Sequence, residues 1–406
     1  MTIDTPARVD SAPVTFGSPE LRQLIEQIGD GVVDRDERGE PPYAKFDLIR
    51  EARLGALRLP LDAGGGGATL RELFEVIIAL GAADPNVAHS VRNHLGTVEN
   101  LIRRPRPEDE RWLERIRHGD LFGVSATELG TAQAGSPDYR YATTITETPD
   151  GLRLSGTKFY STGNQYVDWL VVATADQHGD TVRLIIPTDR PGVVIEDDWD
   201  GIGQRFTGSG TTRFVDVEVT GDDFFAPGGF GGDLPYKGTF PQLHLTAVIA
   251  GILRRIVRDA AEIVRSKQRT FYHAASDSPV DDPILQQSVG LLSSQAFAAE
   301  ALVLSAAEAL GAATDAHGRP DEEEALSLEA TLRAAKAKVV VDELANRAAS
   351  ELFDVGGGST VRRSAHLDRH WRNIRTLAAH NPKTYKAKAI GAHEITGEPL
   401  PRGGFF

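Results

Sequence analysis

The sequence predicts an α+β fold with helical regions at both ends of the chain and a β domain between them. Two changes in the spacing of apolar residues carry this prediction: a helical period gives way to strict alternation near residue 121 and returns near residue 233. The length of 406 residues suits two or three domains. We therefore expect an N-terminal helical domain over residues 1–120, a β domain over 121–232 and a helical bundle over 233–406.

The N-terminal region is expected to contain two amphipathic helices. Ser18 is positioned as an N-cap ahead of apolar residues that recur every three or four positions from Leu21 to Ile28, and the same spacing runs from Leu70 to Ile78. Four consecutive glycines, Gly64–Gly67, interrupt the pattern. Because no Lys-Ser or Lys-Thr pair follows them, we interpret them as a flexible turn rather than a phosphate-binding loop.

The β domain is predicted from runs in which apolar and polar residues alternate. Two such runs, Thr143–Glu147 and Leu152–Gly156, flank the turn residues Pro149–Gly151, which is the pattern of a β-hairpin. A later run alternates valines with acidic residues, so we expect one buried face formed by Val215, Val217 and Val219. The Gly- and Pro-rich stretch Pro227–Gly232 marks the end of this domain.

Long helices are expected after about residue 240. Apolar residues recur at helical spacing from Ile284 to Leu304, and Ala-rich segments continue this spacing to Leu352. Gly318 and Pro320 provide one connection between them. Long amphipathic segments joined by short connections are typical of a helical bundle.

Composition and charge limit the partners of the protein. Its 44 basic and 58 acidic residues give a net charge of −14, and no block of Lys or Arg offsets it, so we expect no nucleic-acid partner. The N-terminus has no basic region followed by an apolar run, and the apolar stretches at 74–80 and 243–253 are too short to span a bilayer. We therefore expect a cytoplasmic protein without membrane contact.

Several kinds of chemistry have no support in the sequence. The chain has no cysteine, which excludes thiolate metal sites and cysteine nucleophiles. No G-x-G-x-x-G motif follows a strand, so a nicotinamide domain is not expected and electrons for a redox reaction would come from another protein. His366 and His370 have the i, i+4 spacing of helical metal ligands, but no third ligand is evident and we expect no metal.

Three motifs of the middle region resemble those of the acyl-CoA dehydrogenase superfamily. They correspond to its T-E-P…A-G-S-D stretch, its K-x-(F/W)-I-T-N-G strand and its D-K-x-G…F-x-D-V-x-V pattern, and here they occupy Gly123–Pro137, Lys158–Gly163 and Asp200–Val219. The resemblance extends over nearly the whole chain. It implies an acyl-CoA dehydrogenase-like fold with an N-terminal helical domain, a central β-barrel-like domain and a C-terminal four-helix bundle.

Two further motifs are similar to those of the flavin-dependent monooxygenase branch of this superfamily. Trp199–Ser209 resembles its W-D-x-x-G-Q-R-x-T-x-S stretch. Asp368–Thr376, followed by His380–Pro382, resembles its D-R-x-W-R-N-x-R-T…H-D-P run, with Asn381 in place of Asp. The resemblance implies an oxygenase that takes reduced FMN, or alternatively FAD, from a separate NAD(P)H-flavin reductase. It also implies a reaction with O2 through a flavin hydroperoxide, a small organosulfur, amine or aromatic substrate, and a homotetramer.

The absence of a carboxylate base distinguishes the monooxygenase interpretation from its main alternative, an acyl-CoA dehydrogenase. An acyl-CoA dehydrogenase needs a carboxylate base to remove the α-proton of the thioester. One family position for that base reads His380–Pro382 here, and the other falls in Leu243–Leu253, which contains no Asp or Glu. A dehydrogenase with an unrecognised base therefore stays as one alternative, and an inactive binding protein on the same fold stays as another.

The resemblance also nominates site residues. His380 is the expected catalytic residue because imidazole can exchange a proton near neutral pH, and Asn93 and His94 are expected on the substrate side. The residues expected to bind the cofactor are Ala126, Thr127, Ser136 and Thr162 at the flavin edge, Tyr160 and Trp199 as an aromatic wall, and Ser209 and Arg269 at the phosphate. Arg269 would come from a neighbouring subunit, and Gly356–Ser359 would bring its backbone close to the cofactor.

Overall fold

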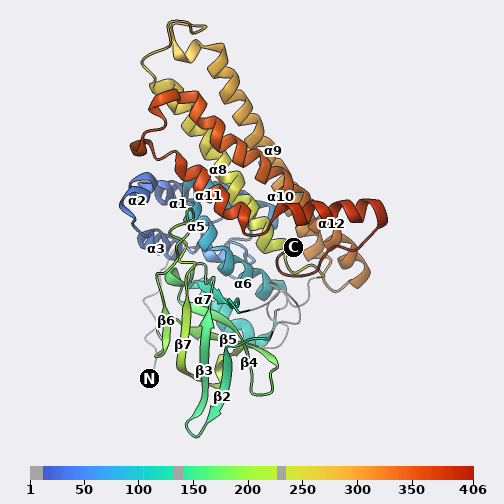
Figure 1. Cartoon of the computed structure of the whole chain (residues 1–406). Coiled ribbons are helices and arrows are strands. Elements are labelled where there is room, and N and C mark those ends of the chain that lie inside the picture. The colour runs from blue at the N-terminus through green and yellow to red at the C-terminus, as the bar shows by residue number, and fades with distance from the viewer. Residues whose placement is uncertain (1–11, 104, 131–139, 226–234) are drawn as a thin grey trace.

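The computed structural model describes residues 12–103, 105–130, 140–225 and 235–406. Figure 1 shows a long helical bundle above a β domain, with shorter helices of the N-terminal region beside their junction. These N-terminal helices are α1 Pro19–Gly29, α2 Val32–Arg38, α3 Tyr43–Glu51, α4 Leu70–Ala83, α5 Pro85–Ser90, α6 Arg92–Arg103 and α7 Glu110–Arg117. The sequence had indicated two of the seven, α1 and α4.

Local signals explain where α1 and α4 begin. The Ser18 hydroxyl accepts a hydrogen bond from the Leu21 amide at 3.1 Å, which confirms the predicted N-cap. Thr69 and Glu72 form a reciprocal capping box at the start of α4. The glycine turn before α4 is packed rather than flexible, because a Cβ at Gly65 would lie 2.2 Å from the Leu59 carbonyl oxygen.

The β domain is one eight-stranded sheet in the order β6-β7-β3-β2-β4-β5-β8, with β1 paired in parallel to β4. Among the described residues, the two end strands of this order are not paired with each other, so the expected barrel is open. The strands are β1 Phe122–Ser125, β2 Thr144–Thr148, β3 Gly151–Lys158, β4 Trp169–Ala175, β5 Thr181–Pro187, β6 Val193–Ile195, β7 Thr212–Val219 and β8 Phe224–Phe225.

The predicted hairpin is confirmed, but the valine face of β7 is only partly right. β2 and β3 pair antiparallel around the turn, as expected. Val217 and Val219 are buried, whereas Val215 is 59% exposed. The register of β3 against β7 shifts at this point, and Asp216 has a positive φ of 51°. The bulge adds one residue to β7 and turns Val215 to the opposite face.

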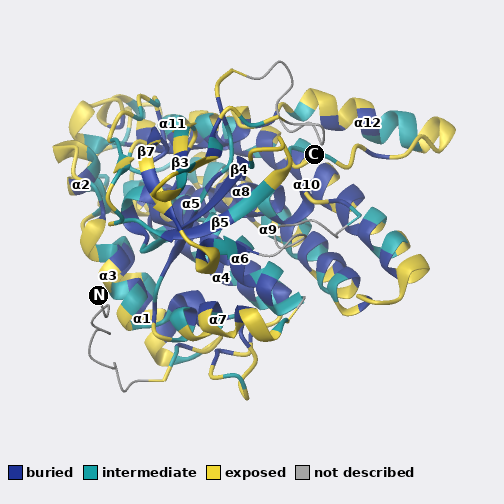
Figure 2. Cartoon of the chain, turned by 90° about the horizontal axis from the view of Figure 1, so that it is seen from below, coloured by how far each residue is buried: buried dark blue, intermediate teal, exposed yellow. Residues whose placement is uncertain are grey.

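The C-terminal region is a bundle of long helices, as predicted. Helices α8, α9 and α10 pack along one another, and α11 and α12 cover the remaining sides of α8 and α10. One hydrophobic cluster joins the regions, since it contains Phe74 of α4, Phe214 of β7 and Val248 of α8. Figure 2 shows this buried centre, with the exposed residues on the outer faces. The bundle helices are α8 Thr239–Ser266, α9 Pro283–Asp315, α10 Pro320–Gly356, α11 Asp368–Ala379 and α12 Lys383–Thr396.

The expected domain boundaries fall between these elements. Residue 120 lies between the end of α7 and the start of β1. Residue 232 lies between β8 and α8, in a stretch outside the described residues that also contains Pro227–Gly232. The boundaries therefore stay a prediction.

Candidate active site

His380 lies at the C-terminal end of α11, opposite the first residue of α6. Its Nε2 is 3.5 Å from Nη1 of Arg92, at the long limit of a hydrogen bond. A guanidinium can only donate, so this contact leaves the His380 proton on Nδ1. His380 is exposed at the surface of the chain, although many protein atoms lie around its ring. Desolvation, together with the positive charges of Arg92, Lys338 and Lys386, lowers the pKa of His380 to about 3.

A second imidazole, His89 on α5, belongs to the same cluster. It is buried, and its Nδ1 lies 3.1 Å from Oε1 of Gln204, while its Nε2 has no partner. Burial lowers the pKa of His89 well below its usual value, and the nearby Arg92, His380 and His244 lower it further. His89 was not among the residues predicted from the sequence, which favoured His94. A signal for His89 was present in the sequence. Asp84-Pro85 marks the start of a short helix, and His89 lies one residue before the end of that helix.

The structure places His94 in the core, away from His380. Its Nδ1 accepts a hydrogen bond from the Phe122 amide at 3.1 Å, which ties α6 to β1. Its other ring nitrogen faces the backbone of Gly55, where an added Cβ would lie 2.3 Å away. Burial lowers the pKa of His94 to about 4, so the ring is neutral and packs as a core residue. It lines a small apolar cavity together with Leu73 and Ile77.

Asn93, Thr162 and Ser209 are brought together by the fold. The Asn93 side-chain amide donates to the Thr162 carbonyl at 2.9 Å. The Thr162 and Ser209 hydroxyls are 2.9 Å apart, and Thr207 extends the chain with a hydroxyl 2.7 Å from Ser209. All three hydroxyls are buried. Short polar side chains of this kind suit the edge of a ring ligand, because they can exchange hydrogen bonds without filling the space.

Tyr160 and Trp199 form the aromatic pair that the sequence suggested. Their ring centroids are 5.9 Å apart with an interplanar angle of 82°. Tyr160 is 54% exposed, so the pair offers free aromatic surface next to Thr162. The indole Nε1 of Trp199 donates to the Gln204 carbonyl at 2.8 Å and fixes that ring in place.

Ala126 and Thr127 follow β1 and are held through their carbonyl groups. The Thr127 carbonyl accepts from the Phe159 amide at 2.9 Å. The Ala126 carbonyl lies 3.4 Å from Nζ of Lys158, which also forms a buried ion pair with Glu128 at 2.6 Å. This pair anchors the segment after β1 next to the strand that leads to Tyr160. Ser136 lies outside the described residues.

Arg269 and Gly356–Ser359 lie far from these residues. Both stretches occur at the end of the bundle that points away from the β domain, where α8 and α10 end (Figure 1). The 22 residues of α8 between His244 and Ser266 extend over about 33 Å. Within one chain, Arg269 therefore cannot contact a ligand beside His380.

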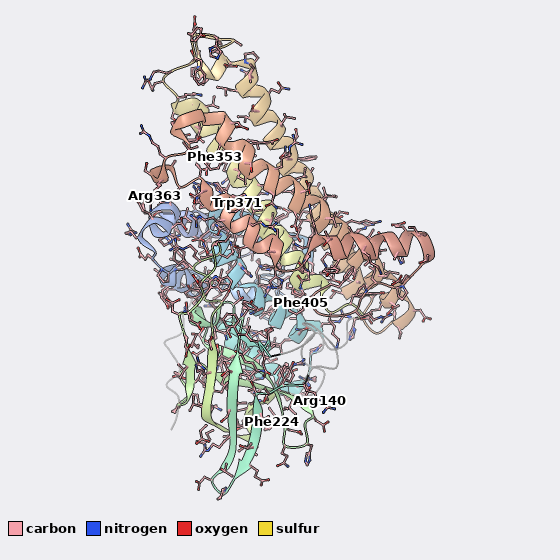
Figure 3. The ribbon with its side chains drawn as sticks, viewed as in Figure 1. Arg140, Phe224, Phe353, Arg363, Trp371 and Phe405 are labelled. Carbon is pink, nitrogen blue, oxygen red and sulfur yellow. The ribbon has the colours of Figure 1, made fainter. Side chains whose placement is uncertain are left out.

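The segment after α12 closes one side of the cluster. The Asn381 side-chain amide donates to Oε1 of Gln242 at 2.8 Å and to the Phe405 carbonyl at 3.0 Å. Gln242 in turn donates to the Gly404 carbonyl at 2.9 Å. These bonds hold the Phe405 ring with its centroid 5.7 Å from that of His380. Figure 3 shows Phe405 at this junction, below α10 and beside α12.

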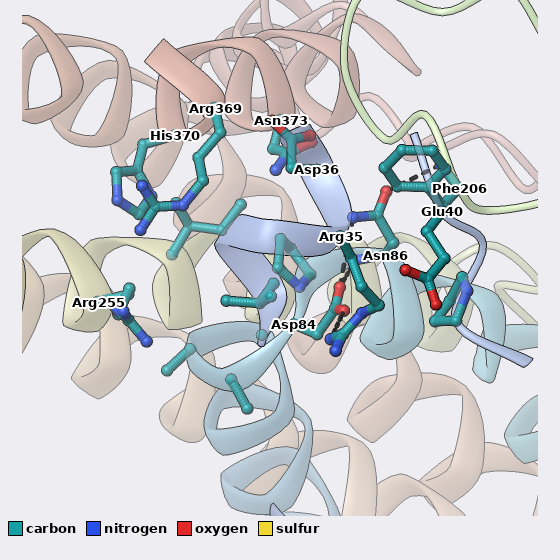
Figure 4. Close-up of a pocket in the computed structure, with 17 residues that line it drawn as sticks. Arg35, Asp36, Glu40, Asp84, Asn86, Phe206, Arg255, Arg369, His370 and Asn373 are labelled. Carbon is teal, nitrogen blue, oxygen red and sulfur yellow. Dashed lines mark hydrogen bonds and ion pairs between the residues drawn. The ribbon is translucent and has the colours of Figure 1, made fainter. Parts of the chain in front are cut away.

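A charged cavity lies between α2, α5, α8 and α11, and Phe206, two residues after Gln204, forms part of its lining (Figure 4). Its charges are paired internally: Arg35 binds Asp84 at 2.8 Å, and Arg369 binds Asp259 at 2.7 Å. Burial lowers the pKa of His370 to about 4, so the neutral ring hydrogen-bonds through Nε2 to Asp259 at 2.7 Å. Among the residues that the structure describes, no group of three His, Asp or Glu side chains could hold a metal ion.

Among the described residues, no Asp or Glu is a main cause of the pKa shifts of His89 and His380. The charges that most strongly shift the pKa values of His89 and His380 are all positive. From α8 the cluster receives Gln242 and His244 instead of an acid, and burial lowers the pKa of His244 to about 3. The described side chains thus offer neutral imidazoles beside Arg92 where a thioester dehydrogenase needs a carboxylate base.

Comparison with known proteins identifies the family. The chain matches the acyl-CoA dehydrogenase middle domain over residues 123–217 and the acyl-CoA dehydrogenase C-terminal domain over residues 243–383. A dibenzothiophene monooxygenase of Mycolicibacterium goodii is 30% identical over 95% of this chain and 94% of its own length. The chain belongs to the flavin-dependent monooxygenase branch of the acyl-CoA dehydrogenase superfamily.

Other members of this monooxygenase branch agree over the full length. A probable FMNH2-dependent monooxygenase, SfnC of Pseudomonas putida, is 28% identical over 94% of this chain and 95% of its own. The crystal structure of FMN-bound TdsC from Paenibacillus sp. A11-2 matches with a TM-score of 0.83 and 26% identity, covering 95% of this chain and 99% of that one. The predicted superfamily and its acyl-CoA dehydrogenase-like fold are confirmed.

The residues of the cluster fit the flavin that this monooxygenase branch implies. Several buried polar atoms near the cluster lack a partner, among them Nε2 of His89, Nε of Arg92 and Oγ of Ser161. Buried polar atoms normally have a hydrogen-bond partner, so a polar ring ligand would supply what is missing. Burial lowers the pKa of Arg92 only to about 10, and its positive charge at neutral pH suits the negative charge of a reduced flavin.

Proposed function

We propose that this chain is the oxygenase component of a two-component system that oxygenates a small organosulfur molecule with O2 and reduced FMN from a separate reductase. The supporting observation is the pair of neutral imidazoles, His89 and His380, beside Arg92. Reduced FMN, when bound, supplies the two electrons with which one oxygen atom of O2 becomes water while the other is transferred to sulfur. FAD is the alternative flavin, and an amine or an aromatic carbon is the alternative acceptor.

Each member of the cluster has a distinct task in this proposal. Arg92 attracts the negative charge of the reduced flavin. The pKa of His380 is about 3, so the ring is neutral at neutral pH. The neutral ring presents its Nδ1–H as a hydrogen-bond donor and does not give up this proton. Asn93 fixes the Thr162 backbone, which positions the Thr162 and Ser209 hydroxyls. Phe405 and the aromatic pair of Tyr160 and Trp199 help to keep water away.

We propose that the active form is a homotetramer. Helix α9 exposes three large apolar side chains, Ile284, Leu291 and Phe297, at 50–76% of their surface. By length and composition α9 could also cross a membrane, with 44% of its most apolar window buried. Contact with other subunits would cover this face. It would also bring Arg269 of a neighbouring subunit toward the flavin, whereas Arg269 of the same chain lies too far away.

The direct experiment mixes the protein, loaded anaerobically with reduced FMN, with oxygenated buffer containing dibenzothiophene. We expect sulfoxide in excess of a protein-free control, with little hydrogen peroxide. His89→Ala should divert the electrons to hydrogen peroxide, whereas the exposed His178→Ala should behave as the wild type. Hydrogen peroxide as the sole product with sulfur, amine and aromatic substrates alike would contradict the proposal.

Two further mixtures distinguish the alternatives. Anaerobic addition of acyl-CoA thioesters to the FAD-loaded protein should leave the flavin absorbance unchanged, and bleaching would establish a dehydrogenase. Titration with reduced FMN should show binding at micromolar concentration. Failure to bind either flavin would favour an inactive binding protein.

A further inference from the structure

Gln204 is a strained residue at the meeting point of two sequence motifs. It belongs to the Trp199–Ser209 stretch, it is fully buried, and its φ of 52° lies in the left-handed region that residues with a side chain rarely adopt. Such backbone strain persists only where the surroundings impose it, and it is concentrated at functional sites. The position therefore calls for a physical reason.

Four hydrogen bonds fix this conformation. The Gln204 amide donates to Oδ1 of Asn373 at 2.7 Å, and Asn373 belongs to the second motif, on α11. The Gln204 carbonyl accepts from the Trp199 indole at 2.8 Å and from the Thr207 hydroxyl at 2.9 Å. The fourth bond joins the side chain, through Oε1, to Nδ1 of His89 at 3.1 Å. Residues of both motifs thus hold the Gln204 backbone in place, and its side-chain amide points at the imidazole of His89.

The direction of that bond decides which nitrogen of His89 carries the proton. An amide oxygen can only accept, so Nδ1 of His89 is protonated and Nε2 keeps a lone pair. The groups that face His89 are Arg92 from α6, His244 from α8 and His380 from α11, and each disfavours a second proton on the ring. Nε2 is buried and has no partner in the described chain.

We propose that Gln204 is a positioning residue that holds His89 in the Nδ1–H tautomer, so that Nε2 accepts a hydrogen bond from an N–H or O–H group of the bound flavin or substrate. The inference rests on the proposed function for its catalytic consequence. The tautomer itself does not depend on that function, which allows the two to be tested separately.

The first test is solid-state NMR of the full-length protein labelled with ¹⁵N-histidine, without flavin. The His89 signals are identified by their loss in His89→Asn. We expect Nδ1 to be protonated and Nε2 unprotonated in the wild type, a mixture of tautomers in Gln204→Met, and no change in Gln165→Met, a matched control from the neighbouring loop. Protonated Nε2 in the wild type would overturn the inference, and so would an unchanged tautomer in Gln204→Met.

The second test measures the sulfoxide formed per reduced FMN consumed. We expect Gln204→Met to lower this ratio about tenfold, as is common when the group that orients a functional histidine is removed. In a His89→Ala background the same substitution should have no further effect, because Gln204 acts through His89. Additive losses would show a general packing role instead and reject the inference.

Gln204→Glu keeps the acceptor and covers the case in which Gln204→Met does not fold. Its carboxylate should preserve the Nδ1–H tautomer and raise the pKa of His89. Below the raised pKa the ring is doubly protonated and its lone pair is lost, so the sulfoxide yield should fall on the acid side at a higher pH than in the wild type. An unshifted pH profile would contradict the inference. Absence of sulfoxide in the wild type would reject the proposed function and leave the NMR result standing.

Discussion

His89, His380 and Arg92 together carry a single positive charge at neutral pH. The two imidazoles are neutral because a charged ring loses more hydration in this site than it recovers and because Arg92 repels a second cation. Arg92 keeps its charge because burial lowers its pKa only to about 10. This arrangement favours an anionic ligand and offers no carboxylate base for a thioester α-proton. The choice between the two chemistries of the fold therefore lies in a few side chains.

We expect His380→Gln to lower the ratio of sulfoxide to hydrogen peroxide by at least tenfold, because removal of one hydrogen-bond donor from an active site costs at least this much. In the wild type the pKa of His380 is about 3, so its neutral form persists from pH 5 to pH 9 and should contribute no step to the pH profile. Arg92→Gln removes a positive charge, raises that pKa and should add a loss of coupling on the acid side. The exposed His273→Gln is the control, and an unchanged ratio in His380→Gln would remove its role.

The site could be predicted from sequence only in part, and the imidazoles show why. His380 was predicted because its neighbours form a recognisable run. His94 was preferred to His89, although the structure turns His94 into the core and His89 toward Arg92. His89 and His94 are five residues apart on two successive helices, α5 and α6, and their rings point in different directions. A six-residue helix is too short for the spacing of its apolar residues to predict which way His89 points.

At the scale of elements, the segment after α12 acts as a wall of the site. Asn381 and Gln242 hold its backbone, and Nζ of Lys386 lies 4.3 Å from the centroid of the Phe406 ring. Lys386 is buried, which lowers its pKa to about 7. The wall is thus fixed by a few polar contacts rather than by a strand or helix. No sequence pattern predicts it, because its register depends on side chains 24 and 162 residues away.

We expect Asn381→Asp to loosen this wall. The carboxylate keeps the shape of the amide but cannot donate to Gln242 or to the Phe405 carbonyl, so two bonds are lost and a charged oxygen faces two acceptor oxygens. Hydrogen peroxide release should rise several-fold as the site becomes more open to water, and amide exchange should increase over residues 403–406. Asn346→Asp on α10 is the matched control. Unchanged exchange in Asn381→Asp would show that the segment is held by other contacts.

Longer elements were predicted better than their details. The alternation in β7 indicated a strand, but the bulge at Asp216 reversed Val215, since a single added residue moves a side chain to the other face. The spacing from Ile284 indicated α9, yet Ile284 and Leu291 are exposed rather than packed within the chain. A periodic apolar face predicts that other residues pack against it, but it does not show whether those residues belong to the same chain or to another subunit.

At the scale of the whole molecule, two features remain unused by one chain: the apolar face of α9 and the basic stretch around Arg269 at the far end of the bundle. A tetramer would use both. We expect a mass of four chains by light scattering in detergent-free buffer, and Arg269→Gln should weaken binding of reduced FMN, whereas the exposed Arg265→Gln should not. A stable monomer that oxygenates its substrate would contradict this assembly.

Mixed tetramers test whether Arg269 acts across subunits. Arg269→Gln and His380→Gln chains each carry one defect, and unfolding and refolding them together produces mixed assemblies. If Arg269 serves the flavin of a neighbour, some sites in these assemblies combine an intact Arg269 with an intact His380, and sulfoxide formation should recover to about a quarter of the wild-type level for two defects distributed at random. If Arg269 acts within its own chain, every site keeps one defect and no activity returns. The geometry of α8, with about 33 Å of helix between His244 and Ser266, favours the first outcome.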